Sequence, residues 1–325
     1  MSSTEESQEL FDLPAEFLER LHRIVPEQSM AEVLHTFTQV KTTSFRVNTV
    51  KAQVEPVLRS LEEARVRIKP VDWCDYAFYV KPHHRRRLTT SDAAMDGLIY
   101  PQNLSSMLTS IVLDPQPGET VLDIASAPGG KSLHMVALMQ NEGWLSAVDS
   151  VRKRFFILKE RLENQGATIA HCYCMDGRDV GRKTPERFDR VMVDAPCSSE
   201  SRFSRRRPAA LEYWSLKKVQ ESSRKQKSLF RSAFDALKPG GRLMYCTCTF
   251  APEENEMVVD HMLRRLGDAI EVLPFELPIE NVQGGITEWG GKQLNPSVAM
   301  SRRILPTFTM NSMFMCLMRK TGAAS

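Results

Sequence analysis

The sequence lacks the features that would place it in a membrane or outside the cell. No apolar run among its 325 residues approaches the roughly 20 residues that a helix needs to cross a bilayer. Residues 1–10 are acidic and contain no apolar core, so we expect neither a secretory signal nor a transit peptide. These absences predict a cytoplasmic protein that does not bind a membrane.

Cysteine is present but forms no recognisable framework. The seven cysteines are an odd number at irregular spacing, which fits free thiols in a reducing compartment. The sequence also lacks the two Cys-x-x-Cys pairs that are typical of a structural zinc site. We therefore expect no bound metal.

The charge of the protein is modest but unevenly distributed. A net charge of +3 does not by itself imply nucleic acid, and a hydrophobic content of 42% is that of an ordinary globular protein. Several basic runs together are typical of a phosphate-binding surface, whereas a single run is usually a solvated face. These runs are residues 83–87, 202–207, 217–218, 224–227 and 302–303.

A strand, a glycine turn and a helix are predicted over residues 121–138. Apolar residues over 121–124 indicate a buried strand, which Pro128-Gly-Gly130 breaks before a helical pattern begins at Lys131. This is the first unit of a doubly wound α/β domain, in which ligands bind outside the carboxyl ends of the strands. Residues from Asp123 to Lys131 are therefore expected to touch a ligand, with glycine where the backbone approaches it closely.

Further strands alternate with helices after this unit. They are expected over residues 144–148, 168–174, 190–194 and 242–248, with a closing strand over 313–318. We expect a small α/β module at residues 1–92 and the doubly wound domain at residues 93–325. The module has no catalytic pattern of its own, so substrate binding is its expected role.

Acidic side chains end the second and third of these strands. Asp149 lies where an acidic residue would hold the hydroxyls of a nucleotide-like ribose, although it could also cap the helix that starts at Val151. Asp176 could accept a hydrogen bond from an adenine amino group, although aspartate is also common in plain turns. The two residues predict a nucleotide-like ligand at the carboxyl edge of the sheet.

Two cysteines lie at the carboxyl ends of neighbouring strands. Cys197 follows the fourth strand and Cys248 closes the fifth, so both are expected to face one crevice. Cysteine among apolar neighbours is most often an inert buried residue. Two thiols beside a ligand site instead indicate covalent chemistry, because thiolate is a strong nucleophile near neutral pH.

Three motifs give the sequence a specific resemblance. Ala127-Pro-Gly-Gly-Lys131, Asp194-Ala-Pro-Cys-Ser198 and Tyr245-Cys-Thr-Cys-Thr249 resemble the signature motifs of the Sun-domain (Fmu/Sun) RNA cytosine-5 methyltransferases, and they occur in the order of that family. Supporting matches are Phe45-Arg-Val-Asn-Thr-Val-Lys51 and Tyr100-Pro-Gln-Asn-Leu-Ser-Ser106. The similarity covers roughly residues 44 to 320.

The resemblance implies a mostly parallel, seven-stranded, Rossmann-like methyltransferase sheet. It also implies S-adenosylmethionine as methyl donor and a cytosine in RNA as acceptor, in a protein that we expect to be a monomer. Family habit favours ribosomal RNA over transfer RNA. The cofactor-binding residues carried over by position are Asp123, Ala125, Ala127, Pro128, Gly129, Gly130, Lys131, Asp149, Arg154, Asp176 and Asp194.

Catalytic roles are implied in the same way. In the family, the cysteine at the position of Cys248 adds to carbon 6 of the base, which makes carbon 5 nucleophilic. The cysteine at the position of Cys197 assists release, when a proton leaves carbon 5 and the thiolate is eliminated. Asp194 is expected to face the ring nitrogen or amino group unless it only caps a turn. Lys131 is expected near the active site unless it is a solvated lysine at a helix start.

The target base must leave any stack to reach the crevice, so flipped or single-stranded RNA is the expected substrate. Arginines near the two motif regions would then hold phosphates, although the loop after Cys197 could also be merely solvated. The residues expected to bind RNA are Arg85, Arg86, Arg87, Arg202, Arg205, Arg206 and Arg207.

The chain departs from the usual pattern of the family at three places. Ser199-Glu200 follows Pro-Cys-Ser where many members have glycine, and Cys246 stands where serine is common. Asn311-Ser-Met-Phe314 replaces the usual Asp-Gly-Phe-Phe. Both catalytic cysteines are retained, so these departures bear on loop shape and substrate choice.

Three other functions fit part of the sequence. DNA cytosine methyltransferases also use a Pro-Cys motif, but their Glu-Asn-Val triplet, here at residues 280–282, comes too late in the order, and Cys248 would be unexplained. An RNA-binding ribosome-assembly factor on a methyltransferase scaffold with little turnover would not need both cysteines. A small-molecule methyltransferase would leave the basic runs and the small module without a purpose.

Overall fold

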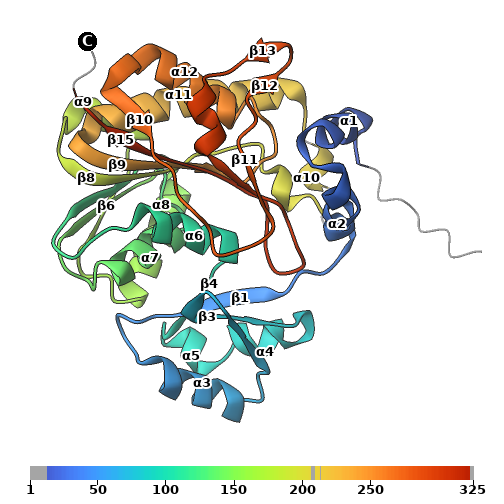
Figure 1. Ribbon diagram of the computed structural model, residues 1–325. Coiled ribbons are helices and arrows are strands. Elements are labelled where there is room, and N and C mark those ends of the chain that lie inside the picture. Colours follow the sequence, from blue (N-terminus) through green and yellow to red (C-terminus); the bar gives the residue numbers. More distant parts are fainter. Residues whose placement is uncertain (1–12, 206–208, 213, 323–325) are drawn as a thin grey trace, which may run out of the picture.

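The computed structural model describes residues 13–205, 209–212 and 214–322. Figure 1 shows a large upper body built around one twisted sheet, with a smaller module below it. Helices α1 (Ala15–Ile24) and α2 (Glu27–Thr38) precede the small module in the chain but pack against the large body. Phe17 and Phe37 on these helices contact Phe250, which lies just beyond Cys248. The first helices therefore support the cysteine-bearing edge of the sheet.

The large sheet has nine strands among the described residues. Their order is β11-β14-β15-β9-β8-β5-β6-β7, and β10 pairs with β15. The strands from β9 to β7 are parallel, and the others run antiparallel. The bounds are β5 (Thr120–Asp123), β6 (Trp144–Val148), β7 (Ala170–Tyr173), β8 (Phe188–Asp194), β9 (Leu237–Thr247), β10 (Ile270–Val272), β11 (Val282–Gly284), β14 (Arg302–Ile304) and β15 (Met313–Lys320).

This arrangement confirms the predicted doubly wound α/β domain but corrects the expected number of seven strands. Strands β10, β11 and β14 have three residues each. A segment of that length is too short to show a period of two, so the sequence gives no signal for it.

Helices cover both faces of the large sheet (Figure 1). Met244 and Cys246 of β9 point to the face covered by α6 and α7, whereas Leu243 and Tyr245 point to the face covered by α11 and α12. Cys248 continues the first series and packs with the same core. The bounds are α6 (Leu104–Leu113), α7 (Gly130–Leu138), α8 (Arg152–Asn164), α9 (Val180–Lys183), α11 (Leu216–Ala236) and α12 (Glu256–Leu266).

The small module is an antiparallel sheet with its own core. Its strand order is β2-β3-β1-β4, and its core includes Phe45 and Phe78. The bounds are β1 (Thr43–Val47), β2 (Ile68–Val71), β3 (Cys74–Val80), β4 (Ile99–Pro101), α3 (Val54–Glu63), α4 (Arg85–Thr89) and α5 (Asp92–Met95). Strand β4 belongs to this sheet, although it lies beyond residue 92. The division at 1–92 and 93–325 stays a prediction.

Three further short elements are α10 (Ala209–Glu212), β12 (Glu288–Trp289) and β13 (Lys292–Gln293). Within the described ranges, none of the helices has the length and apolar character needed to cross a bilayer. In the same part of the chain, no group of three or more His, Cys, Asp and Glu side chains is arranged to hold a metal ion.

Candidate active site

Cys197 and Cys248 face each other at the carboxyl edge of the large sheet. Their sulfur atoms are 3.4 Å apart. Cys197 follows β8 and Cys248 follows β9, and these two strands are parallel neighbours, so both loops leave the sheet on the same side. The structure thus brings together the two thiols that the sequence placed in one crevice.

Lys131 and Asp194 form an ion pair within the same cluster. Lys131 Nζ lies 2.7 Å from Asp194 Oδ2, and the lysine side chain is only 8% exposed. The other carboxylate oxygen lies 3.7 Å from Cys246 Sγ. Burial opposes the charge on Lys131, but attraction to Asp194 outweighs it and raises the pKa of the lysine. Lys131 is therefore a buried cation that holds Asp194 in place, not a solvated lysine.

The surroundings of the two sulfur atoms differ. The hydrogen bond between the two sulfurs lowers the pKa of Cys248 against the effect of burial, with help from the charge of Arg202. The same hydrogen bond, together with burial, raises the pKa of Cys197. Cys248 is consequently the thiol poised to ionise.

The glycine turn before α7 leaves little space for side chains. Gly129 has φ of +105°, which favours glycine, and a Cβ on Gly130 would come 3.2 Å from the ring of Tyr100. Asp123, at the end of β5, is fully buried and accepts a hydrogen bond from Ser132 Oγ at 2.6 Å. Burial raises the pKa of Asp123 to about 7, and its second oxygen has no hydrogen-bond partner among the described residues.

A cavity of about 220 Å³ opens at the carboxyl ends of β5, β6 and β7. Four of the predicted cofactor-binding residues line it: Ala125, Asp149, Arg154 and Asp176. Ile124 also lines it and belongs to the stretch from Asp123 to Lys131 that was expected to touch a ligand. The remaining lining residues were not predicted: Ser150, Gly177, Arg178, Pro196, Lys225 and Leu229. The other predicted residues lie outside its lining, in the glycine turn or in the cysteine cluster: Asp123, Ala127, Pro128, Gly129, Gly130, Lys131 and Asp194.

The two strand-end aspartates both face this cavity and make local contacts. Val151 N donates to Asp149 Oδ1 at 2.9 Å, and Arg154 lies 3.2 Å from Oδ2. Asp149 therefore makes a local turn contact just before α8 as well as lining the cavity, but the N-cap residue of that helix is Val151, whose side chain makes no capping hydrogen bond. Hydrogen bonds from the Arg178 side chain lower the pKa of Asp176 and keep it ionised.

Two buried carboxylates that the sequence did not indicate tie the cysteine loops together. Glu200 accepts hydrogen bonds from Thr249 Oγ1 at 2.7 Å and from Phe250 N at 2.8 Å. Glu254 accepts from Ser198 N at 3.0 Å. The loop after Cys197 is thus bonded twice to the loop after Cys248. Both glutamates stand in polar stretches without periodicity, so no sequence signal pointed to them.

Glu254 is expected to make the stability of the protein depend on pH. Burial, reinforced by the charge of Glu200, raises the pKa of Glu254 from 4.5 to about 8. The folded state then binds this proton more tightly than the unfolded chain, so the free energy of unfolding should fall as pH rises from about 4.5 to about 8. Glu254→Gln keeps a hydrogen-bond acceptor for Ser198 N but has no carboxyl group to titrate, so its free energy of unfolding should not show this fall. Urea denaturation of both proteins across the range is the test, and a constant difference between them would contradict the expectation.

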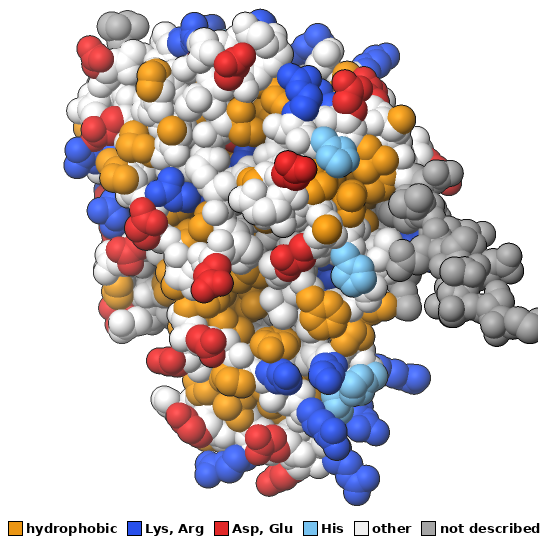
Figure 2. Space-filling model, turned by 45° about the vertical axis from the view of Figure 1, so that its right-hand side comes forward, with side chains coloured by type: hydrophobic (Ala, Val, Ile, Leu, Met, Phe, Trp, Pro, Cys, Tyr) orange, Lys and Arg blue, Asp and Glu red, His pale blue; other side chains and the backbone are white. Residues whose placement is uncertain are grey.

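The arginines expected to bind RNA lie in two places. Arg85, Arg86 and Arg87 are exposed on α4 of the small module, where Figure 2 shows basic side chains gathered at the lower end of the molecule. Arg202 and Arg205 are exposed in the loop after Cys197. Arg206 and Arg207 lie outside the described residues.

A second basic feature of the small module is a cavity of about 720 Å³ beside α4. Arg65, Arg67 and Arg87 line it, and none of the three forms an ion pair with a described residue. Glu62 is the single carboxylate among its described lining residues. The remaining lining residues are Val66, Ile68, His83 and His84. The cavity is therefore a concave site with excess positive charge.

The doubly wound sheet, with a ligand cavity and reactive side chains at its carboxyl edge, defines an α/β methyltransferase. The crystal structure of PH0851 has this fold with a TM-score of 0.85 and 30% identity, over 98% of this chain and 69% of that one. The family model described as 16S rRNA methyltransferase RsmB/F matches residues 110–319. A model of the N-terminal domain of 16S rRNA methyltransferase RsmF matches residues 13–104. The chain belongs to the RsmB/F methyltransferase family, which confirms the family predicted from the three motifs.

Two similar proteins are named for different RNA substrates. The ribosomal RNA small subunit methyltransferase F of Vibrio parahaemolyticus is 36% identical over 290 residues, which are 88% of this chain and 60% of that protein. The tRNA (cytosine(49)-C(5))-methyltransferase of Pyrococcus abyssi is 38% identical over 264 residues, 81% of this chain and 83% of that protein. The chain thus spans about three fifths of the length of the Vibrio methyltransferase F.

Proposed function

We propose that this protein transfers a methyl group from S-adenosylmethionine to carbon 5 of a cytosine in RNA. The observation that carries the proposal is the approach of the Cys197 and Cys248 sulfurs to 3.4 Å at the edge of the sheet that also holds the ligand cavity. Membership in the RsmB/F family supports it, as do the names of the two relatives. Ribosomal RNA is preferred as substrate over transfer RNA because both matching family models are of 16S rRNA methyltransferases.

The cavity at the ends of β5, β6 and β7 suits S-adenosylmethionine. Its two carboxylates are acceptors for the donors that this molecule offers, with Asp149 for the ribose hydroxyls and Asp176 for the adenine amino group. When bound, the cofactor supplies the activated methyl group. The other residues proposed to form its site are Asp123, Ala125, Ala127, Pro128, Gly129, Gly130, Lys131, Arg154 and Asp194.

Cys248 is the proposed nucleophile, because its surroundings favour the thiolate. The sulfur forms a bond to carbon 6 of the cytosine, and the displaced electron pair makes carbon 5 nucleophilic. Asp194, held by Lys131, would accept a hydrogen bond from the amino group of the base and orient the ring. After methylation a base accepts the proton from carbon 5, the electron pair left behind re-forms the double bond to carbon 6, and the Cys248 thiolate leaves. Cys197 assists this step.

The same proposal assigns separate roles to the small module and to the doubly wound domain. Residues 93–325 would carry the methyltransferase site, and residues 1–92 would contact RNA. The protein would act as a monomer in the cytoplasm, on a cytosine that is single-stranded or flipped out of its stack.

The basic cavity of the small module is expected to contribute to RNA binding. Arg67→Gln should weaken binding severalfold and reduce the slope of log affinity against log salt by about 1, because one phosphate contact is lost. Fluorescence anisotropy with labelled RNA at several salt concentrations measures both quantities. Arg59→Gln is the matched control, since Arg59 is exposed on α3 of the same module but lies outside the cavity. Equal slopes for the two variants would contradict a phosphate contact at Arg67.

Bisulfite sequencing of total RNA tests the function directly. Cells that carry the gene should show one or a few protected cytosines that become unprotected when the gene is deleted. The purified protein should restore protection with S-adenosylmethionine. Binding of S-adenosylmethionine without methylation of any RNA would overturn the proposal and favour an RNA-binding assembly factor.

A further inference from the structure

Ser199 lies against both sulfur atoms of the cysteine pair. The Cys248 thiol donates to Ser199 Oγ at 3.8 Å, and the same oxygen lies 3.9 Å from Cys197 Sγ. The same hydroxyl is 3.4 Å from the Cys197 carbonyl oxygen, to which it donates. A hydroxyl can rotate between acceptors, so this one can turn from a carbonyl to whichever sulfur carries negative charge.

The backbone of Ser199 is in the left-handed region, with φ of +59° and ψ of +33°. This conformation is unfavourable for a residue with a Cβ and is one that glycine adopts readily. Residues held in sparsely populated conformations cluster at functional sites. An observed outlier of this kind, with its side chain against the reacting sulfurs, points to a use for the hydroxyl.

The neighbours of Ser199 fix its position. On one side, Ser198 N donates to Glu254 at 3.0 Å, and Ser198 Oγ lies 2.8 Å from Thr249 Oγ1. On the other side, Glu200 is anchored by its hydrogen bonds from the loop after Cys248. The backbone of Ser199 cannot move away from the sulfurs without breaking contacts that tie the two cysteine loops together.

We propose that the Ser199 hydroxyl is a second hydrogen-bond donor to the Cys248 thiolate, beside the Cys197 thiol. The inference rests on the proposed role of Cys248 as nucleophile. The hydroxyl donates a hydrogen bond without losing its proton. It does so before the thiolate adds to the cytosine and again when the thiolate is eliminated from it. The charged groups that face Cys248 are Arg202 and Lys131, which favour the thiolate, and Asp194, which opposes it. Ser199 adds a neutral donor to this balance.

The pH dependence of Cys248 alkylation tests this role in the full chain. Iodoacetamide reacts with thiolate, and peptide mass spectrometry separates Cys248 from the other cysteines. Ser199→Ala removes the hydroxyl but leaves a residue with a Cβ in the unfavourable left-handed conformation. Ser199→Gly removes the hydroxyl and also relieves that conformation. In both variants the pH midpoint of Cys248 alkylation should rise by about half to one unit. At a pH below the wild-type midpoint, alkylation of Cys248 should then be about three- to tenfold slower.

Ser198→Ala is the matched control, because it disturbs the same loop while its hydroxyl contacts Thr249 rather than sulfur. Its midpoint should stay at the wild-type value. An unchanged midpoint in both Ser199 variants, or an equal shift in Ser198→Ala, would overturn the inference. The assay contains neither RNA nor methyl donor, so a failure of the proposed function would appear separately, as absent methylation with the thiol titration intact.

Discussion

Replacing Cys248 with alanine is expected to abolish methylation of RNA, with a loss of at least about a thousandfold in rate. Carbon 5 of cytosine is a poor nucleophile until a group adds to carbon 6, and no other thiolate in the cluster is as favoured as that of Cys248. No covalent complex with RNA should form either. Transfer of a labelled methyl group and a denaturing gel with labelled RNA measure the two effects.

Cys197→Ala should behave in the opposite way on the same gel. Addition to the base remains possible, but release is impaired, so a protein–RNA adduct that survives denaturation should accumulate. Cys174→Ala is a suitable control, because Cys174 is exposed and lies outside the cysteine cluster. It should retain activity and trap no RNA. If Cys197→Ala and Cys248→Ala exchange their behaviour, the two roles are assigned the wrong way round.

The meeting of these two cysteines could be predicted because it depends on local patterns and one topological rule. Apolar runs ended by turn residues indicated the parallel strands, and residues 144–148 were found as β6 with the bounds expected. Neighbouring parallel strands deliver their carboxyl ends to one edge of the sheet. The positions of Cys197 and Cys248 in the sequence then determine that they face each other.

The support of the site could not be predicted, because it depends on contacts between distant segments. Glu200 and Glu254 are buried only because two separate loops fold over them, and nothing in their local sequence distinguishes them from solvated glutamates. The packing of Phe37 against Phe250 joins segments more than 200 residues apart. Periodicity reports which face of an element is buried but not its partner.

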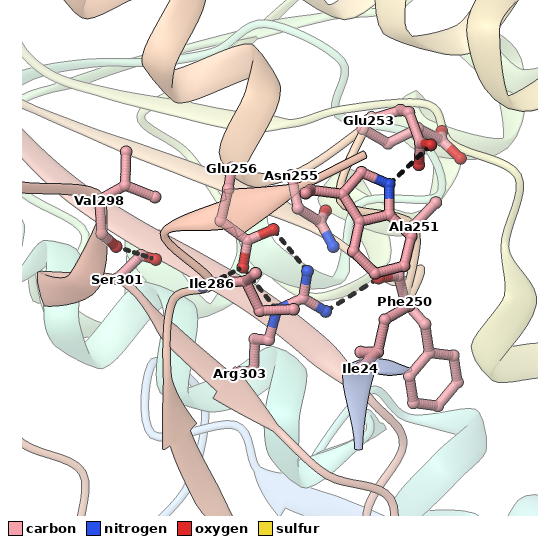
Figure 3. A network of polar contacts seen from close by, with 12 residues as sticks. Ile24, Phe250, Ala251, Glu253, Asn255, Glu256, Ile286, Val298, Ser301 and Arg303 are labelled. Atoms are coloured by element: carbon pink, nitrogen blue, oxygen red, sulfur yellow. Dashed lines mark hydrogen bonds and ion pairs between the residues drawn. The ribbon is translucent and has the colours of Figure 1, made fainter. Parts of the chain in front are cut away.

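Arg303 and Glu256 form a buried ion pair behind the loop that follows Cys248. Arg303 Nε and Nη2 lie 2.5 Å from the two carboxylate oxygens, and Nη1 donates to the Phe250 carbonyl at 2.8 Å. Figure 3 shows the guanidinium between Glu256 and Phe250. The side chains are 4% and 0% exposed, so water cannot replace either partner. The pair therefore joins β14, α12 and the cysteine loop.

Arg303→Ala is expected to lower the free energy of unfolding by about 3–5 kcal/mol, because Glu256 would remain buried without its counter-ion. Arg302, the preceding residue, pairs with the exposed Glu276, so Arg302→Ala should cost less than about 1 kcal/mol. Urea denaturation of both variants gives the comparison. A similar small cost for both would contradict the structural role assigned to the buried pair.

The double variant Glu256→Gln, Arg303→Met separates the ion pair of Arg303 with Glu256 from its hydrogen bond to the Phe250 carbonyl. It leaves no charge buried without a partner, so it should recover part of the stability that Arg303→Ala loses. It does not restore the hydrogen bond to the Phe250 carbonyl, two residues beyond Cys248. If stability returns while Cys248 is alkylated more slowly than in the wild type, that hydrogen bond is what positions the cysteine loop. If stability returns and alkylation of Cys248 proceeds at the wild-type rate, the ion pair contributes to stability alone.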